Sequence, residues 1–147
     1  MSEENKALVR RQVEELLSGG KLDVADEVYA PSYVGHDPSN PEEVRGLQAA
    51  KQAAAEYRKA FPGPRVSVED LIAEGDRVAA RLRFRGTHLG ELDGIAPTGR
   101  RVDCTGIVIS RIEEGKIAED WANFDDLGMM QQLRVIPEPG QQPTTTS

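Results

Sequence analysis

The apolar residues of this chain change their spacing at Pro62-Gly63-Pro64. Before this point they recur at steps of three and four, which marks one face of a helix: Leu47, Ala50, Ala54, Tyr57 and Phe61. After it, residues 77–88 alternate between apolar residues and arginines, which is typical of a strand with one buried face. Helices followed by strands predict an α+β fold in which helices cover one face of a sheet.

The same patterns predict the other elements. We expect a helix over 2–18 that ends at Gly19-Gly20, a second over 22–30 that Pro31 stops, and a short extended segment over 33–36. Pro62-Gly63-Pro64 closes the third helix. An antiparallel meander of about four strands should follow, over 66–74, 77–88, 101–112 and 117–125, and then a short helix over 126–133.

Length predicts the domain organisation. A chain of 147 residues is typical of one domain, which we place at residues 1–136. Residues 137–147 contain no apolar residue, so we expect a disordered C-terminal tail there.

Composition excludes several classes of protein. A net charge of -7 disfavours nucleic acid and anionic membranes as partners, and no stretch approaches the ~18 apolar residues of a membrane span. Cys104 is the only cysteine, and the polar N-terminus does not resemble a signal peptide, so we expect a cytoplasmic protein without disulfides. His36 and His88 lack the spacing of a metal site, so none is expected.

Several segments together resemble one known family. They are His36-Asp37-Pro38, Arg85-Gly86-Thr87-His88-Leu89-Gly90-Glu91-Leu92, Gly94-Ile95-Ala96-Pro97-Thr98-Gly99-Arg100, Gly115-Lys116-Ile117 and Gln131-Gln132-Leu133. The chain resembles the SnoaL-like polyketide cyclases, or ester cyclases, of the NTF2-like superfamily over about residues 5–136. The resemblance implies a cone of N-terminal helices packed on a curved, mainly antiparallel sheet, with an apolar pocket and a homodimer. It also implies ring closure by intramolecular aldol chemistry without a cofactor.

The resemblance places the family's catalytic acid at Ala122 and its assisting histidine at Val108, and neither side chain can move a proton. Asp120 lies two residues before Ala122, on the same face of an ideal strand, and is our candidate general acid/base. If that face lines the pocket, Asp120 is shielded from water and its pKa is raised. If Trp121 points inward instead, Asp120 is a solvated surface charge, and a bulge would reverse the two faces. The sequence leaves both arrangements open.

Two histidines are candidates for assisting the acid by donating to a substrate oxygen. His88 shares the inward parity of Phe84 if the strand stays regular through Gly86, but a structural histidine bonded to backbone at a strand bend fits equally. His36 can reach the mouth of a pocket, or it can lie exposed beside a turn that Asp37 begins.

The aromatic and aliphatic residues supply the expected substrate-binding wall, although Trp121 also fits a core or dimer interface. We assign to it Tyr33, Tyr57, Phe61, Leu71, Phe84, Trp121 and Phe124. The sequence therefore predicts a protein that binds a small apolar or polyketide-like molecule, and a cofactor-independent polyketide or ester cyclase in which Asp120 transfers the proton. The alternatives are a non-catalytic small-molecule-binding or dimeric scaffold protein, or a relative of epoxide hydrolases and isomerases.

Overall fold

The computed structural model describes residues 2–137 and residue 140. Its helical segments are α1 (Ser2–Arg11), η1 (Gln12–Ser18), α2 (Val24–Val28), α3 (Leu47–Ala60) and α4 (Asp126–Gln132). Its strands are β1 (Tyr29–His36), β2 (Val44–Arg45), β3 (Arg65–Glu74), β4 (Arg77–Thr87), β5 (Arg101–Glu113) and β6 (Lys116–Phe124). The predicted tail at 137–147 lies outside the described residues except at positions 137 and 140.

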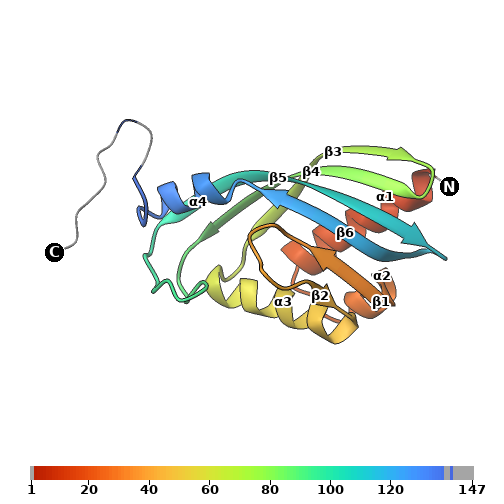
Figure 1. Cartoon of the computed structure of the whole chain (residues 1–147), viewed down its shortest axis with the longest axis horizontal. Helices are drawn as coiled ribbons and strands as arrows, with labels where there is room; N and C mark the ends of the chain where they lie inside the picture. Colours follow the sequence, from red (N-terminus) through yellow and green to blue (C-terminus); the bar gives the residue numbers. More distant parts are fainter. Residues whose placement is uncertain (1, 138–139, 141–147) are drawn as a thin grey trace.

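The strands form one six-stranded sheet in the order β2-β1-β6-β5-β4-β3. Helices α1 and α3 pack beneath this curled sheet, so the predicted α+β architecture is confirmed (Figure 1). The meander from β3 to β6 is confirmed as well. The prediction of about four antiparallel strands was incomplete, because β1 joins β6 in parallel and the two-residue β2 extends the edge.

The second helix is shorter than predicted. It ends at Val28, and Tyr29 is already extended, with φ -97° and ψ 141°. Pro31 therefore lies inside β1 and does not end the helix. A proline cannot donate to a sheet, but the register between β1 and β6 shifts between Tyr29 and Val34, so the ladder is interrupted where Pro31 lies.

The first predicted helix has the expected bounds, but its second half is π-helical. The Gly19 backbone N–H bonds to the Glu14 carbonyl, five residues earlier, at 3.0 Å. Such widened turns are rare and occur often at functional sites. Here η1 begins at Gln12, whose side chain is buried beneath the sheet.

The alternating pattern of β4 produces the two faces that the sequence predicts. Val78, Ala80, Leu82 and Phe84 are buried in the core, whereas Arg83 and Arg85 point outward and pair with Asp103 of β5. Cys104 is buried on the inner face of β5. Among the helices that the structure describes, none is long and apolar enough to span a bilayer.

Candidate active site

A β-bulge in β6 decides which side chains face the interior. Ile112 of β5 pairs with Ile117, but Arg111 pairs with Glu119, so Ala118 is an extra residue on β6. Both Ile117 and Ala118 are buried as a result. Beyond the bulge Glu119 faces outward and Asp120 faces inward, opposite Ser110.

Asp120 is a buried carboxyl group that accepts three hydrogen bonds. Its Oδ1 accepts from the Ser110 hydroxyl at 2.5 Å. Its Oδ2 accepts from the Tyr33 hydroxyl at 2.9 Å and from Gln12 Nε2 at 3.0 Å. Gln12 Nε2 also donates to the Tyr29 hydroxyl at 2.9 Å, which fixes the position of the amide. Residues from η1, β1, β5 and β6 thus converge on a single carboxyl group.

Burial raises the pKa of Asp120, because the charged form loses its hydration. The hydrogen bonds from Ser110, Tyr33 and Gln12 oppose this shift by favouring the carboxylate. The pKa of Tyr33 is raised by burial and by the nearby Asp120 charge, so its phenol stays protonated. A carboxyl group with a raised pKa beside a protonated phenol is suited to taking up and returning a proton.

Asp120, Tyr33 and Gln12 line a cavity of about 400 Å³ between the sheet and the helices. Asp120, Ala122 and Phe124 share the face of β6 that borders the cavity, which is the arrangement that gives Asp120 its shielded position. Most of the remaining wall is apolar and comes from η1, α3, β4 and α4, with Val13, Ala54, Leu82 and Met129 as examples.

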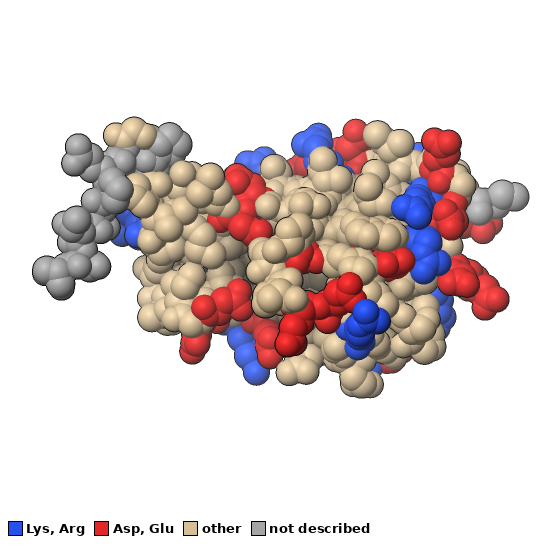
Figure 2. All heavy atoms as spheres, in the orientation of Figure 1, with Lys and Arg blue, Asp and Glu red and all other residues tan. Residues whose placement is uncertain are grey.

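Carboxylates border the same cavity, namely Asp37, Glu42, Asp93 and Asp126. Figure 2 shows acidic side chains gathered near the middle of this face of the molecule, where the surface is hollowed. The pKa of Asp126 is raised by its partial burial and by the charge of Asp37. Arg58 also lines the cavity, where its guanidinium donates to the Leu17 and Ser18 carbonyls, and the four carboxylates outnumber it. The border of the cavity is therefore unfavourable for an anionic ligand.

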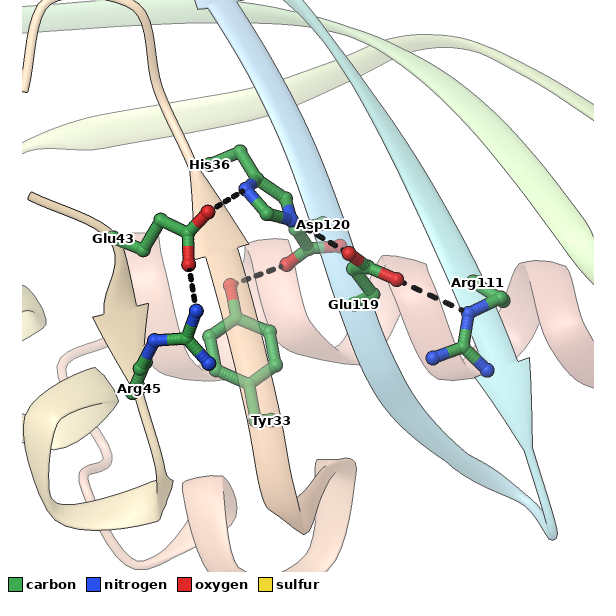
Figure 3. Close-up of polar contacts among 7 residues, drawn as sticks. All are labelled: Tyr33, His36, Glu43, Arg45, Arg111, Glu119 and Asp120. Atoms are coloured by element: carbon green, nitrogen blue, oxygen red, sulfur yellow. Dashed lines mark hydrogen bonds and ion pairs between the residues drawn. The ribbon is translucent and has the colours of Figure 1, made fainter.

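His36 reaches the border of the cavity, but its ring nitrogens are bound on the other face of the sheet. In the parallel ladder Gly35 lies beside Asp120, whereas His36 lies beside Trp121. The His36 ring is held between two carboxylates, with Nδ1 at 3.2 Å from Glu43 and Nε2 at 2.6 Å from Glu119 (Figure 3). This contact and Arg111 hold the pKa of Glu119 below its usual value.

His88 is fully buried and does not border the cavity. Its Nδ1 accepts from the Thr98 backbone N–H at 3.2 Å and lies 3.0 Å from the Thr98 hydroxyl. Its backbone bonds to Gly99 and Arg100, so it holds together the ends of the loop that follows β4. Within the described part of the chain, Nε2 has no hydrogen-bond partner. This geometry matches the structural alternative that the sequence left open.

The predicted wall residues divide into three groups. Tyr33, Tyr57, Phe84 and Phe124 border the cavity. Phe61 and Leu71 do not: Phe61 is fully buried behind Tyr57 and Phe84, with ring centroids 5.4 Å and 5.1 Å away, and Leu71 packs against the core from β3. Trp121 points to the outer face, stacks on His36 and borders a separate hollow of about 290 Å³.

Sequence reasoning did not find Ser110 or Gln12. Ser110 has the inward parity of β5, but a regular hairpin would place it opposite Glu119, and only the bulge brings it opposite Asp120. Gln12 lies among charged residues in the first helix. A helical projection that placed this glutamine on the buried face of the helix could have identified it.

Comparison with known proteins identifies the family. The SnoaL-like polyketide cyclase family matches residues 7–133. The chain is 35% identical over 134 residues to the aklanonic acid methyl ester cyclase DnrD of Streptomyces peucetius, covering 86% of this chain and 88% of that protein. It is 32% identical to the nogalonic acid methyl ester cyclase of Streptomyces nogalater, covering 78% and 86%.

A solved structure supports the same family assignment. A SnoaL-like protein from Jannaschia sp. CCS1 superposes with a TM-score of 0.85 and 28% identity, covering 92% of this chain and 95% of that one. The family match spans almost the whole folded region, and the curled sheet over α1 and α3 is the architecture that the resemblance implies. The chain therefore belongs to the SnoaL-like polyketide cyclase family.

Proposed function

We propose that this protein is a cofactor-independent cyclase that closes a ring within a neutral, polyketide-like ester by intramolecular aldol chemistry. The observation that carries the proposal is Asp120, a buried carboxyl group with a raised pKa in the wall of a mostly apolar cavity. The methyl ester cyclases that the chain resembles support this assignment.

The chemistry needs one group that takes and returns a proton. Asp120 removes a proton from the carbon next to a substrate carbonyl, and the resulting enolate carbon attacks a second carbonyl of the same molecule. A carbon–carbon bond forms, and the new alkoxide takes the proton back from Asp120. A positioned acid/base contributes ~10²–10⁴-fold to such a step, and a cavity that holds the reacting carbons together contributes more.

The carboxylates at the border of the cavity support a neutral substrate. Asp37, Glu42, Asp93 and Asp126 would repel a free carboxylate, whereas an ester carries no charge. A small polyketide ester can bury its rings against Tyr57, Phe84 and the aliphatic wall, which favours binding through the hydrophobic effect.

One observation favours a second candidate, a non-catalytic binding protein. Val108 and Ala122, which stand where the resemblance places the family's histidine and acid, both border the cavity and are apolar. The cavity would then bind a small apolar molecule without changing it, and Asp120 would be a buried polar group whose partners satisfy it.

The experiment that separates the two candidates uses the purified protein with aklanonic acid methyl ester and nogalonic acid methyl ester. Cyclised product is followed by chromatography and proton NMR, and binding is measured by calorimetry. Catalytic turnover of either ester supports the cyclase. Binding of both esters without turnover supports the binding protein and removes the cyclase for these esters.

The homodimer suggested by the resemblance also belongs to the proposal. Ile72, Ala79, Ile109 and Trp121 lie side by side across β3, β4, β5 and β6 on the outer face of the sheet. Ile72 is 64% exposed and Ile109 is 39% exposed. A second copy of the sheet can cover this apolar row. Light scattering on the wild type and on an Ile72→Lys/Ile109→Lys variant tests it: a dimer that the substitutions dissociate is expected, and a monomeric wild type would contradict it.

A further inference from the structure

We propose that Tyr33 donates a hydrogen bond to the substrate's reacting oxygen, by moving its hydroxyl from Asp120 to that oxygen when substrate binds. The inference rests on the proposed cyclase and assigns a second catalytic residue to the same site.

The hydrogen bonds around Asp120 supply the first argument. The two oxygens of a carboxylate together have about four sites for donors. Oδ2 already accepts from both Tyr33 and Gln12, and Oδ1 is bonded to Ser110, which does not border the cavity. Oδ2 can take a substrate proton only if one of its two donors leaves.

Tyr33 is the donor that is free to leave. The amide nitrogen of Gln12 is fixed by a second hydrogen bond to Tyr29. The Tyr33 hydroxyl has Asp120 as the acceptor of its proton (Figure 3). Both residues border the cavity. A rotation about its C–O bond turns the proton from Oδ2 toward a ligand oxygen. Ser110 and Gln12 continue to hold the carboxyl group during this exchange.

The backbone holds the Tyr33 ring in place for this role. Gly35 lies beside Asp120 in the ladder, and a Cβ at Gly35 would approach the Tyr33 hydroxyl to 2.8 Å and the ring to 3.2 Å. The ring therefore lies across Gly35, and it also contacts the Tyr29 ring, with centroids 4.4 Å apart. A glycine at position 35 is what allows the hydroxyl to approach Asp120.

The phenol is protonated when it is needed. Burial and the Asp120 charge raise the pKa of Tyr33, so the group donates and does not ionise. During enolisation the substrate C–H bond breaks, an O–H bond forms at Oδ2, and the carbonyl π electrons move to the substrate oxygen. The Tyr33 O–H stays intact, and its hydrogen bond strengthens as negative charge grows on that oxygen. Such a bond stabilises the transition state more than the bound ketone.

The test measures binding of substituted 2-naphthols of graded acidity, whose oxygens mimic the enolate oxygen. Asp120→Asn serves as the background, because its amide replaces the carboxyl without charge. In this background affinity should rise with naphthol acidity. Adding Tyr33→Phe should flatten the dependence, and so should adding Gly35→Ala, which keeps the hydroxyl but displaces it. Adding Thr105→Ala, a substitution on the exposed outer face of β5, is the control that should preserve the dependence.

Turnover gives the second readout. In the wild-type background, Tyr33→Phe should lower kcat by about 10²–10³-fold, as loss of one oxyanion donor does, with little change in KM. An equal dependence on acidity with and without the Tyr33 hydroxyl would overturn the inference. If the dependence on Tyr33 is present but neither methyl ester is turned over, Tyr33 remains an oxygen donor and the cyclase assignment fails.

Discussion

The Tyr33 hydroxyl donates to Oδ2 of Asp120 at 2.9 Å, although the two residues are 87 positions apart in the chain. The parallel pairing of β1 with β6 creates this contact by bringing Gly35 beside Asp120. A protonated phenol and a shielded carboxyl group thus meet at one point of the cavity wall.

Asp120 should make the protein less stable as pH rises. Its folded pKa is raised above the unfolded value of 3.8, so between these two values the folded state binds more protons than the unfolded state. The free energy of unfolding contributed by this group therefore falls with increasing pH across that interval. Urea unfolding of Asp120→Asn, compared with the wild type from pH 4 to 8, should show that this fall is lost. A steeper fall in the variant would contradict the sign of the shift.

Ser110→Ala should move the pH dependence of catalysis upward. The Ser110 hydroxyl stabilises the carboxylate form of Asp120, so its removal raises the pKa of Asp120 further. The rising limb of kcat/KM against pH should shift to higher pH. Thr105→Ala is the matched control, because Thr105 lies on the same strand but is exposed on its outer face. Identical profiles for wild type and Ser110→Ala would remove Ser110 from the control of Asp120.

His36→Gln should retain most activity. Both ring nitrogens of His36 are directed to Glu43 and Glu119, so we expect turnover within about tenfold of the wild type, less than the ~10²-fold minimum for a proton-transferring group. The partly exposed contacts should contribute below about 1 kcal/mol to the free energy of unfolding. A loss of turnover as large as that of Asp120→Asn would restore His36 as a catalytic residue.

Gly90→Ala should destabilise the fold without changing the chemistry. A Cβ at position 90 would clash with the backbone carbonyl of Lys59 at the end of α3, while the Gly90 N–H bonds to the Ala60 carbonyl at 3.1 Å. The backbone must shift, at a cost of about 1–3 kcal/mol. Urea titration measures this loss, with Gly86→Ala as a milder comparison because only side-chain atoms approach there. An unchanged midpoint for Gly90→Ala would show that the loop is not tightly packed.

A methyl ester should bind better than its free acid. The carboxylates Asp37, Glu42, Asp93 and Asp126 repel a ligand anion, and one such charge at ~8 Å with an effective dielectric constant of ~20 contributes about 2 kcal/mol. The ester should therefore bind more than about tenfold tighter in calorimetry at low salt, and added salt should narrow the difference. Equal affinities would show that the acidic border does not select the ligand.

The sequence predicted the elements that depend on regular spacing. The alternation in β4 identified its buried face, and the helical steps before Pro62 identified α3, because each pattern directly reports which side chains are shielded from water. The prediction that Pro31 ends the second helix was wrong. A proline is compatible with the end of a helix and with an interruption in a strand, and only the pairing of β1 with β6 distinguishes the two.

The site itself was only partly predictable. Ile117 and Trp121 are four positions apart, so they lie on the same face of a regular strand. A regular hairpin that buried Ile117 would therefore also have pointed Trp121 inward and Asp120 outward. The extra residue at Ala118 reverses the faces, and no local signal in the sequence marks it. The partners of Asp120 could not be identified either, because Gln12 and Tyr33 reach it through long-range packing of η1 and β1.

The rate of ring closure by Asp120→Asn, measured with whichever methyl ester the wild type turns over, tests directly whether Asp120 moves the proton. The asparagine oxygen can accept from Tyr33 and Gln12, and its amide can donate to Ser110, so the fold and the affinity for the ester should persist. If Asp120 transfers the proton, turnover should fall by about 10²–10⁴-fold while binding measured by calorimetry stays within a few-fold. Wild-type turnover by this variant would show that another group moves the proton.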